Sequence, residues 1–593
     1  MNIAFASDAA DIPRLVLYGV KGKKRIEIPF DEDRRVGNVY YMGLSGLDGE
    51  ECTYNFISGG REVTDPYAKR LSGDEVWGRH NPKAVWKKEG FDWGNDRSPG
   101  IETEDMIIYL LHVRGFTMHR SSGVAHRGTF EGIIEKIPYL KSLGINTLEL
   151  MPVYDFNEVM EQKAENTGEA AKPVNSGSRG NRRLNYWGFT KGAYMTPKNA
   201  YSACGNGVRS FKALVKALHE ASLEVLIQFY FPPGLNPDYV IDVLREWVAS
   251  YHVDGMRILG EELPLRQILS DPYLSSTKLV FKSGAGEALA EAMADTNDRR
   301  RRVLLLNEGF LPDNRQFLKS DSDMLKRFVN HQFLCRPLYA VLNYMDSYDA
   351  MTLMDMVSYD RKHNEENGEN NTDGTDYNYS WNCGVEGPSR RRAVRLLRLK
   401  QIRNAFTYLL LAQGVPEFVA GDEFMHSRKG NNNAYCQDNM TNWLNWSELE
   451  KNREMKDFVS ALIAMRKNHR MFHDGAPKKL MDYKSCGCPD VSLHGDQAWL
   501  AKLDNYNRHV GIMYCGEYEQ QETKEAKDYY VAYNMHWQHH KFALPKPLKG
   551  RSWRIIMMTG KGFLEEPELY PGNEIVVNSR SITLLEAVNE GGR

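Results

Sequence analysis

Carboxylate side chains that could take part in catalysis follow several apolar segments of this chain. Four of them stand near the ends of such segments: Glu261, Glu262, Glu308 and Asp349. Carboxylates that meet at one site can act as a nucleophile and as a general acid or base. In the stretch VDGMRILGEE, however, the second residue after Arg257 is Leu259, which has no lone pair with which to attack an electrophile.

From about residue 105, predicted strands alternate with predicted helices. These elements position the carboxylates. Helices are predicted at 129–144, 210–222, 237–251 and 392–414, between strands at 106–113, 146–153, 223–231, 253–259, 277–281, 302–308, 338–345 and 416–421. Strands that alternate with helices in this way predict an α/β fold with a central parallel (β/α)8 barrel. In that fold the chemistry lies at the carboxyl ends of the strands.

The segments on either side of the predicted barrel have a different pattern. Residues 1–100 contain short β-type runs broken by Gly, Asp and Asn, which predict an N-terminal β-sandwich. Residues 101–475 form the predicted barrel domain, and residues 476–593 return to alternating strands that predict a C-terminal β-sandwich. Within the barrel, the polar stretch 161–183 is predicted to be a long mobile loop over the mouth, and 363–388 is dense in Asn and Gly.

The bulk composition excludes several kinds of partner. The chain has 593 residues, a formal net charge of −2 and a pI near 6.8, which argues against nucleic acid and anionic membranes. The sequence contains no run of about 18 apolar residues, so no membrane-spanning helix is predicted. Because the N-terminal segment also lacks the pattern of a secretory signal, we expect a cytoplasmic protein.

The cysteines predict no metal site. They stand at positions 52, 204, 335, 383, 436, 486, 488 and 515. Cys486 and Cys488 are the one close pair, and no second pair or nearby His completes a zinc-binding pattern. We therefore expect free thiols in a reducing cytoplasm, with no metal and no cofactor.

Several long motifs together resemble one family of enzymes. They are HVRGFT (112–117), RGTFEGIIEKIPYLKSLGINTLELMPVYDF (127–156), NYWGF (185–189), VDGMR (253–257), NGENNTDGTDYNYSWNCGVEG (367–387), AGDEF (420–424) and GNNNAYCQDN (430–439). This set resembles the isoamylase, pullulanase and glycogen-debranching branch of the α-amylase family, glycoside hydrolase family 13, over nearly the whole chain. The resemblance implies a starch-binding-like (CBM48-type) N-terminal sandwich, α-glucan ligands and α-1,6 branch points as substrate.

The same resemblance places non-catalytic residues where the family has its carboxylates. Retaining glycoside hydrolysis uses two carboxylates about 5–5.5 Å apart. The family's nucleophile position falls on Leu259, and its general-acid position falls on Lys282. The third carboxylate is retained as Asp349, although Tyr348 replaces the His before it. We predict that Leu259 and Lys282 meet at the barrel mouth and that Lys282 forms an ion pair with Asp349.

Substitute carboxylates are the alternative. Glu308 lies in NEGFLPDNRQFLKSD, which resembles a non-catalytic segment of the family after strand 6. Glu261 and Glu262 lie two or three residues past the usual nucleophile position, roughly 7–10 Å along an extended chain, which is too far without rebuilding of the site.

Sugar contacts do not depend on the catalytic groups. The resemblance implies that Tyr186 of NYWGF stacks on a sugar ring, and the residues expected to contact glucan are Tyr186, Trp187, Arg257, Tyr348, Asp349 and His112. Core packing is the alternative for the aromatic residues, and pairing with another acid is the alternative for Arg257. Trp77, Trp86 and Trp93 of the N-terminal sandwich form a further candidate glucan platform, or pack in the core.

Three functions remain open at this point. The first is a catalytically inactive debranching-enzyme homologue that binds α-glucan (glycogen, starch or maltooligosaccharides), an active partner enzyme, or a second copy of itself. The second is an active α-1,6-glucan hydrolase with non-standard catalytic residues. The third is a pure interaction protein that has lost sugar binding.

Overall fold

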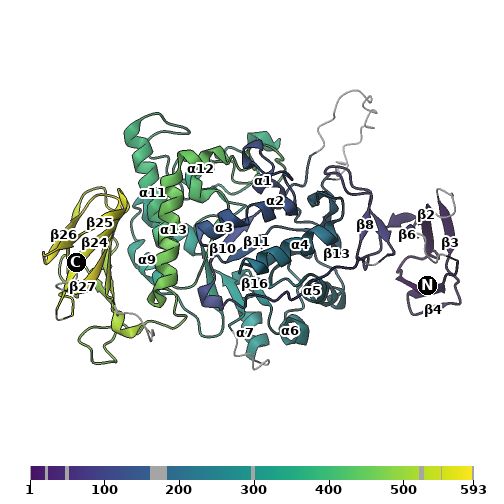
Figure 1. Cartoon of the computed structure of the whole chain (residues 1–593), viewed down its shortest axis with the longest axis horizontal. Helices are drawn as coiled ribbons and strands as arrows, with labels where there is room; N and C mark the ends of the chain where they lie inside the picture. Colours follow the sequence, from purple (N-terminus) through teal and green to yellow (C-terminus); the bar gives the residue numbers. More distant parts are fainter. Residues whose placement is uncertain are drawn as a thin grey trace.

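The computed structural model describes residues 2–19, 25–46, 52–87, 89–160, 183–294, 301–519, 527–548 and 550–589. A barrel occupies the middle of the molecule, and β-sheets from the two ends of the chain lie on opposite sides of it (Figure 1). Residues 161–182 of the predicted mobile loop lie outside the described residues. Within the described part, no helix has the length and apolar character that a membrane span requires.

The central sheet is a closed barrel of parallel strands, which confirms the predicted α/β fold. In order around the barrel the strands are β10 (Ile108–Leu111), β11 (Thr147–Leu150), β14 (Glu224–Tyr230), β15 (Gly255–Leu259), β16 (Lys278–Phe281), β17 (Val303–Leu306), β18 (Ala340–Tyr344) and β19 (Val415–Val419). β19 pairs with β10 and closes the barrel. All carboxyl ends therefore meet at one mouth.

Helices surround the barrel. They are α1 (Val113–Thr117), α2 (Phe130–Glu135), α3 (Ile137–Leu143), α4 (Gly207–Glu220), α5 (Pro237–Tyr251), α6 (Leu265–Ser270), α7 (Gly286–Ala294), α8 (Phe310–Lys319), α9 (Leu325–Gln332), α10 (Leu353–Met356), α11 (Arg392–Leu411), α12 (Ser447–Lys451) and α13 (Arg453–Asn468). The sequence determines the ends of α5 clearly: Asn236 caps its first turn, Pro237 opens it, and His252 ends it in a left-handed conformation. This helix leads directly into β15.

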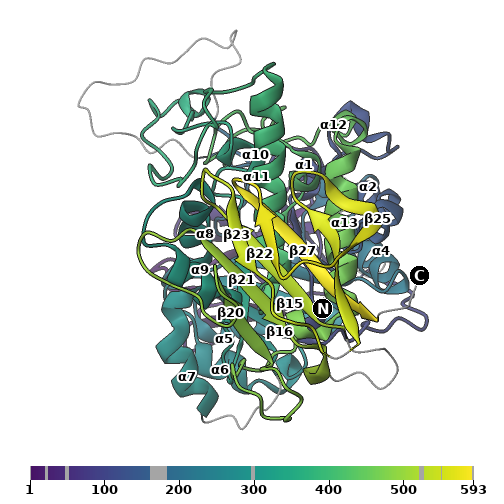
Figure 2. The same ribbon diagram turned by 90° about the vertical axis from the view of Figure 1, so that its left-hand side faces the viewer.

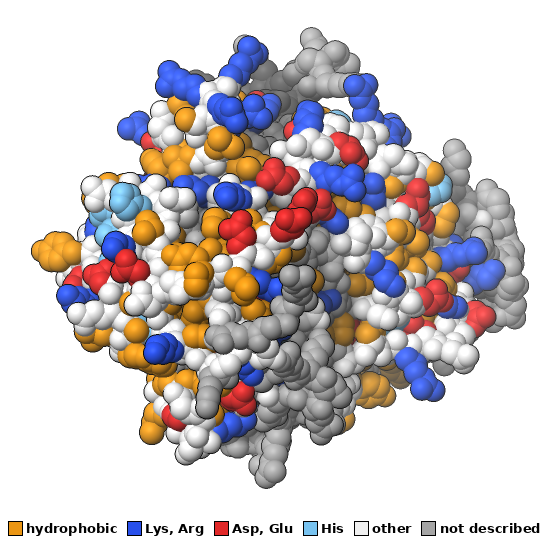
Figure 3. All heavy atoms as spheres, turned by 60° about the vertical axis from the view of Figure 1, so that its left-hand side comes forward, with side chains coloured by type: hydrophobic (Ala, Val, Ile, Leu, Met, Phe, Trp, Pro, Cys, Tyr) orange, Lys and Arg blue, Asp and Glu red, His pale blue; other side chains and the backbone are white. Residues whose placement is uncertain are grey.

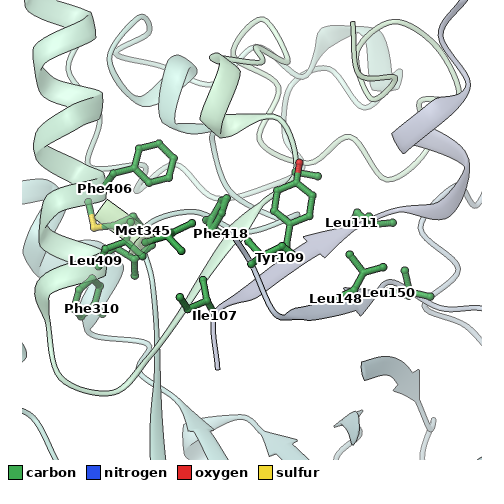
Figure 4. Packing of buried hydrophobic residues seen from close by; sticks show 14 of the residues in the cluster. Ile107, Tyr109, Leu111, Leu148, Leu150, Phe310, Met345, Phe406, Leu409 and Phe418 are labelled. Atoms are coloured by element: carbon green, nitrogen blue, oxygen red, sulfur yellow. The ribbon is translucent and has the colours of Figure 1, made fainter. Parts of the chain in front are cut away.

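Alternate residues of each barrel strand face outward and pack against the helices. Tyr109, Leu148 and Phe418 from the strands lie in one cluster with Phe406 and Leu409 from α11 (Figure 4). Full burial of side chains of this size stabilises a fold by about 1.5–3 kcal/mol each. The inward-facing residues at the amino ends of the strands form a separate apolar layer, which includes Ile108, Leu226, Val280, Leu304 and Leu342.

The N-terminal residues form two small sheets. β1 (Asn2–Ala6), β5 (Val39–Gly43) and β4 (Arg35–Val36) make one, and β3 (Ile26–Pro29), β2 (Arg14–Tyr18), β6 (Thr53–Ser58), β9 (Lys83–Val85) and β8 (Leu71–Ser72) make the other, with β7 (Arg61–Val63) paired to β6. A further pair, β12 (Tyr154–Phe156) and β13 (Gly192–Pro197), follows the second barrel strand.

The tryptophans of the N-terminal region are packed, as the alternative interpretation had it. Trp86 contacts Tyr54, with ring centroids 4.4 Å apart. Trp93 stacks on His252 at 3.8 Å. Trp77 stacks on Tyr201 at 5.6 Å and so joins the N-terminal region to the barrel. All three rings therefore make packing contacts, and each remains partly exposed.

The C-terminal residues form a six-stranded antiparallel sheet beside α11 and α13 (Figures 1 and 2). Its strands, in order, are β20 (Val491–His494), β21 (His509–Tyr514), β22 (Tyr529–Asn534), β27 (Ser581–Asn589), β24 (Arg551–Met558) and β25 (Gly562–Tyr570), with β23 (His540–Ala543) and β26 (Glu574–Val577) as a separate pair. On this side of the molecule hydrophobic side chains are interspersed with charges of both signs (Figure 3).

The cysteines correct one expectation. Cys488 and Cys515 form a disulfide, so the prediction that all the thiols are free is wrong. The two residues are far apart in sequence. Val491 at the start of β20 pairs with Tyr514 at the end of β21, and this pairing brings the two cysteines together. This long-range pairing was not visible in the spacing of the cysteines.

Candidate functional site

A polar layer crosses the inside of the barrel just below its mouth. Arg257 on β15 donates hydrogen bonds from Nη2 to Glu149 Oε2 on β11, at 2.8 Å, and to Glu417 on β19. Gln228 on β14 donates to Glu149 Oε1 at 2.6 Å. All these side chains are buried. Arg257 therefore pairs with acids of the barrel itself, which is the alternative to the predicted sugar contact.

Two carboxylates share one guanidinium in this layer. Burial raises the pKa of Glu417 to about 8, Arg257 opposes the rise, and the neighbouring Glu149 adds to it. A single positive charge does not neutralise two buried carboxylates. The Glu417 carboxyl therefore retains a proton near neutral pH, which removes the unpaired buried charge.

Leu259 and Lys282 lie at the mouth, one step above the polar layer. In the parallel ladder of β15 and β16, Arg257 pairs with Val280. Leu259 and Lys282 stand two residues further along each chain, so the register brings them to neighbouring positions. Leu259 is buried and Lys282 is exposed.

The charged groups at the rim do not form the predicted ion pair. Asp349, in the segment after β18, and Lys282 are both exposed, and within the described residues no ion pair joins them. Exposed charges gain little from pairing, because water solvates each of them and holding two side chains together costs entropy. Glu308 follows β17 and accepts a hydrogen bond from Ser283 Oγ at 2.6 Å. Burial raises the pKa of Tyr344 most strongly, and Glu308 and Asp349 both raise it further, so both carboxylates lie on Tyr344's side of the rim.

Aromatic side chains fill the centre of the mouth. A cavity of about 40 Å³ lies beside them, on the side of the mouth formed by β10 and β19. Its lining residues are Leu110, Leu111, His112, Gly115, Phe116, Met151, Tyr186, Trp187, Tyr348, Val419, Ala420, His426, Arg428, Asn442 and Leu444. None of these residues carries a carboxylate. Tyr348 meets Trp187 edge-on, with ring centroids 5.1 Å apart, and Phe189 at 4.9 Å.

Tyr186 and His112 are packed against each other inside this cavity wall. Their rings stack with centroids 4.0 Å apart, and Tyr186 is only 1% exposed. His112 Nδ1 accepts a hydrogen bond from Gly115 N at 3.1 Å, so Nε2 carries the hydrogen that is donated to Tyr186 O at 2.8 Å. Burial lowers the pKa of His112 to about 4, which keeps the ring neutral. One face of the Tyr186 ring is thus covered by protein rather than open to a sugar.

The substitute nucleophiles considered from the sequence lie away from this cavity. Glu261 and Glu262 are exposed, and neither lines it. Glu262 Oε2 accepts a hydrogen bond from Gly234 N at 3.1 Å, which directs it to the loop after β14. The expectation that neither residue reaches the nucleophile position agrees with this placement.

The Asn-rich segment forms a wall beside the mouth by bonding to a second segment far along the chain. Asn364 Nδ2 donates to Asn432 Oδ1 at 2.9 Å. Asn367 Nδ2 and Asn433 Nδ2 both donate to Asp373 Oδ2, at 2.7 and 2.9 Å. Segments 363–388 and 430–439 therefore stabilise each other through amide side chains.

A much larger cavity lies among the described residues at the opposite end of the barrel. It measures about 930 Å³ and is lined by residues at or before the amino ends of strands, among them Glu224, Asp254 and Lys278. Lys278 Nζ lies 2.6 Å from Glu224 Oε2, and His219 lies between Asp96 and Asp254 at 2.9 and 3.0 Å. Because this end of a (β/α)8 barrel serves stability, these pairs are interpreted as structural.

Glu149 and Glu417 are the site residues that the sequence analysis missed. Each is an isolated acid within an apolar strand, in TLEL and VPEFV. An acid in a fully buried strand must find a partner inside the barrel. That signal, together with Arg257 in GMRIL, could have predicted the polar layer.

The fold and the mouth define a class: a (β/α)8-barrel protein between two β-sheet regions, built like a glycoside hydrolase. No family model matches the chain. It is 30% identical over 534 residues to the glycogen operon protein GlgX homolog of Haemophilus influenzae, covering 73% of this chain and 77% of that protein. It is 27% identical over 646 residues to the chloroplastic isoamylase 3 of Oryza sativa subsp. japonica, covering 92% and 78%.

Solved structures share the fold. A type I pullulanase from Bacillus subtilis, complexed with maltose, superposes with a TM-score of 0.71 at 19% identity over 99% of this chain and 84% of that one. The pullulanase from Paenibacillus barengoltzii, complexed with maltohexaose and α-cyclodextrin, gives 0.68 at 20% identity over 99% and 94%. The chain belongs to the isoamylase and glycogen-debranching branch of glycoside hydrolase family 13.

Proposed function

We propose that this protein is a non-catalytic member of its family, which binds α-glucan chains without cleaving them and serves as a binding or regulatory subunit beside an active debranching enzyme. The observation that carries the proposal is Leu259 at the carboxyl end of β15, where the resemblance places the nucleophile. The small cavity of about 40 Å³ beside Tyr186 also has no carboxylate among its lining residues.

The reaction of the family needs groups that this cavity does not offer. One carboxylate must attack the anomeric carbon, and a second must protonate the leaving oxygen from about 5–5.5 Å away. Leu259 at the position assigned to the nucleophile cannot attack. Lys282 at the position assigned to the acid is exposed and carries no carboxyl group with which to protonate the leaving oxygen.

The cavity beside Tyr186 is too small for a sugar ring. Small-molecule pockets usually measure about 300–1,000 Å³, many times the volume of this cavity. Trp187 and Tyr348 are among its lining residues. A bound glucan therefore lies across the rim and does not enter the cavity.

The rim offers groups suited to such a chain. Asp349 and Lys282 are exposed and can form hydrogen bonds with sugar hydroxyls. Tyr348 and Phe189 are partly exposed aromatic rings in mutual contact, against which a sugar face can pack. Contacts of this kind support dissociation constants in the micromolar to millimolar range, or about −8 to −4 kcal/mol.

The rival function is a hydrolase with substitute carboxylates. The observation that favours it is that Glu308 and Asp349 lie on the same side of the rim, where both act on the pKa of Tyr344. In this alternative they would serve as the acid and the nucleophile on a glucan bound across the rim.

One set of experiments separates the two functions. The purified chain is incubated with pullulan, glycogen and amylopectin, and released reducing ends are compared with a buffer blank. Binding is measured by affinity electrophoresis in glycogen gels and by calorimetry with maltohexaose. We expect retardation in the gel and no turnover, and we expect Asp349→Ala to weaken retardation.

The matched control is Glu566→Gln, an exposed acid on β25 far along the chain, which should leave binding unchanged. Turnover that disappears in Glu308→Gln or Asp349→Asn would replace the proposal by the hydrolase. Absence of both turnover and retardation would leave the pure interaction protein.

A further inference from the structure

Three cysteine sulfurs meet at one point in the C-terminal sheet region. The Cys486 sulfur lies 3.8 Å from that of Cys488 and 4.0 Å from that of Cys515. Together they form a group in which all ligand atoms lie within 4.8 Å of one another. Cys488 and Cys515 are buried and Cys486 is partly exposed. The sequence showed only the Cys486–Cys488 pair, because β21 supplies the third sulfur.

A carboxylate stands beside the three sulfurs. Asp482 Oδ1 lies 3.7 Å from the Cys486 sulfur. Its orientation is held by hydrogen bonds from Cys486 N at 3.0 Å, Gly487 N at 2.9 Å and Tyr518 Oη at 2.7 Å. These bonds hold the Asp482 carboxylate beside Cys486, just outside the group of three sulfurs.

We propose that Cys486, Cys488 and Cys515, in their reduced state, bind one Zn²⁺ ion, and that the exposed side chain of Asp482 turns toward the three sulfurs to become the fourth ligand. Structural zinc is tetrahedral, with Zn–S distances of about 2.3 Å, which places two thiolate sulfurs about 3.8 Å apart. The separations of Cys486 from its two neighbours, 3.8 and 4.0 Å, match that geometry. Thiolates are soft ligands that favour zinc over magnesium or calcium.

The disulfide-bonded form and the zinc-bound form are two states of this cysteine cluster. Reduction of the Cys488–Cys515 bond by a dithiol transfers two electrons and two protons to the sulfurs, and the dithiol becomes a disulfide. Zinc then displaces the protons of the three thiols. The Cα atoms of Cys488 and Cys515 are 6.7 Å apart, at the wide end of the range of about 4.4–6.8 Å for disulfides, which leaves room for the longer separation of a metal site.

The position of the cluster shows which segments of the chain the ion would join. Cys488 lies three residues before β20, and Cys515 immediately follows β21. Cys488 and Cys515 lie in the core of the C-terminal sheet, and Cys486 and Leu548 pack against it. The ion would tie the loop that contains Asp482 to the end of β21.

Cobalt titration tests the proposal on the full chain. Metal-free protein is reduced with a phosphine and titrated with Co²⁺, which reports thiolate ligation through a charge-transfer band and tetrahedral geometry through intense d–d bands. Zn²⁺ is then added. We expect one equivalent of Co²⁺ per chain, displaced by one equivalent of Zn²⁺, and no binding after oxidation of the thiols.

Variants assign the ligands. Cys486→Ser changes a partly exposed side chain and leaves the disulfide pair intact, so it should fold and should lose the tetrahedral spectrum. Asp482→Asn should bind Co²⁺ more weakly and retain the charge-transfer band. Cys204→Ser, at an exposed free cysteine elsewhere, is the matched control and should behave as wild type.

Two outcomes would overturn the proposal. If the reduced wild-type chain binds no Co²⁺ above the level of the oxidised chain, the cluster is a disulfide with a bystander thiol. If Cys486→Ser binds Co²⁺ with the wild-type spectrum, the metal lies elsewhere. Thermal denaturation with and without Zn²⁺ gives a second readout, because Zn²⁺ should raise the Tm of the wild type and not that of Cys486→Ser.

Discussion

Trp187 meets Tyr348 edge-on across the mouth of the barrel, with ring centroids 5.1 Å apart. Tyr348 stands at the position where the family is expected to have a polar histidine, so an aromatic contact replaces part of a hydrogen-bonding network. The two rings line the small cavity beside Tyr186.

Replacing Tyr348 by Ala should reopen this space. We expect the free energy of unfolding to fall by about 1–3 kcal/mol, because a packed ring is lost. Maltotriose should bind about 2- to 10-fold more tightly, because a sugar can then pack on Trp187. Calorimetry and urea denaturation measure the two effects. Tyr348→Phe retains the ring and is the control, and equal affinities in all three proteins would contradict the prediction.

Restoring a carboxylate at Leu259 should not restore hydrolysis. Leu259→Asp places a charge in a buried position beside the acidic polar layer, which should cost about 1–3 kcal/mol of unfolding free energy. Leu259→Met should cost less than about 1.5 kcal/mol. Reducing-end assays on pullulan should show no product for Leu259→Asp or for its combination with Lys282→Glu. Product from either protein would mean that the mouth opens more easily than its packing indicates.

Glu417 should make stability depend on pH. Its pKa is raised from 4.5 to about 8 in the folded state, so between these values the folded chain retains a proton that the unfolded chain has lost. This stabilisation is complete below about pH 4.5 and is lost as pH rises through about 8, with a slope of at most about 1.4 kcal/mol per unit.

The variant Glu417→Gln lacks the contribution of Glu417 to the pH dependence of the free energy of unfolding. Comparing it with the wild type therefore separates this contribution from those of other groups. The pKa of Asp74 is also raised to about 8, mainly by burial, and Asp74 titrates in the same window in both proteins. The difference between the wild-type and Glu417→Gln unfolding free energies, measured in urea from pH 5 to about 8.5, should therefore change steadily in favour of the variant. A constant difference would show that Glu417 is ionised throughout.

Arg257 should be essential to the fold. Arg257→Met leaves Glu149 and Glu417 facing each other without their cation, which should cost about 3–5 kcal/mol. Combining it with Glu149→Gln and Glu417→Gln replaces all three ionisable groups and should recover much of that loss. Chemical denaturation of the single and triple variants provides the test. A triple variant as unstable as the single one would show that packing of the Arg257 stem, and not charge, carries the effect.

The barrel could be predicted from the sequence because its signals are local. VDGMRIL and TKLVF are apolar runs after helices or turns, and they gave β15 and β16 nearly as observed. The motifs also identified the family, through long segments such as GNNNAYCQDN. Leu259 and Lys282 could be placed at the mouth because the ends of parallel strands must meet there.

The contents of the mouth could not be predicted in the same way. Whether Asp349 pairs with Lys282 depends on side-chain directions and solvent, and both proved to be exposed. Whether Tyr186 faces a sugar or His112 depends on how Trp187 and Tyr348 pack above it. The cysteine cluster depends on the register of β20 with β21, across a separation of 27 residues.

The link between Cys488 and Cys515 also protects the sheet from its own edge. β20 is the outermost strand of the six-stranded sheet, and among the described residues β21 is its one strand partner. An exposed edge is a template for strand addition by another copy, and hence for aggregation. Here the edge strand has only four residues, Val491–His494, and the cysteine link fixes the segment that leads into it. A brief opening of this edge during thermal stress would thus expose little backbone, and the chain should resist self-association better with the cluster intact than with it broken.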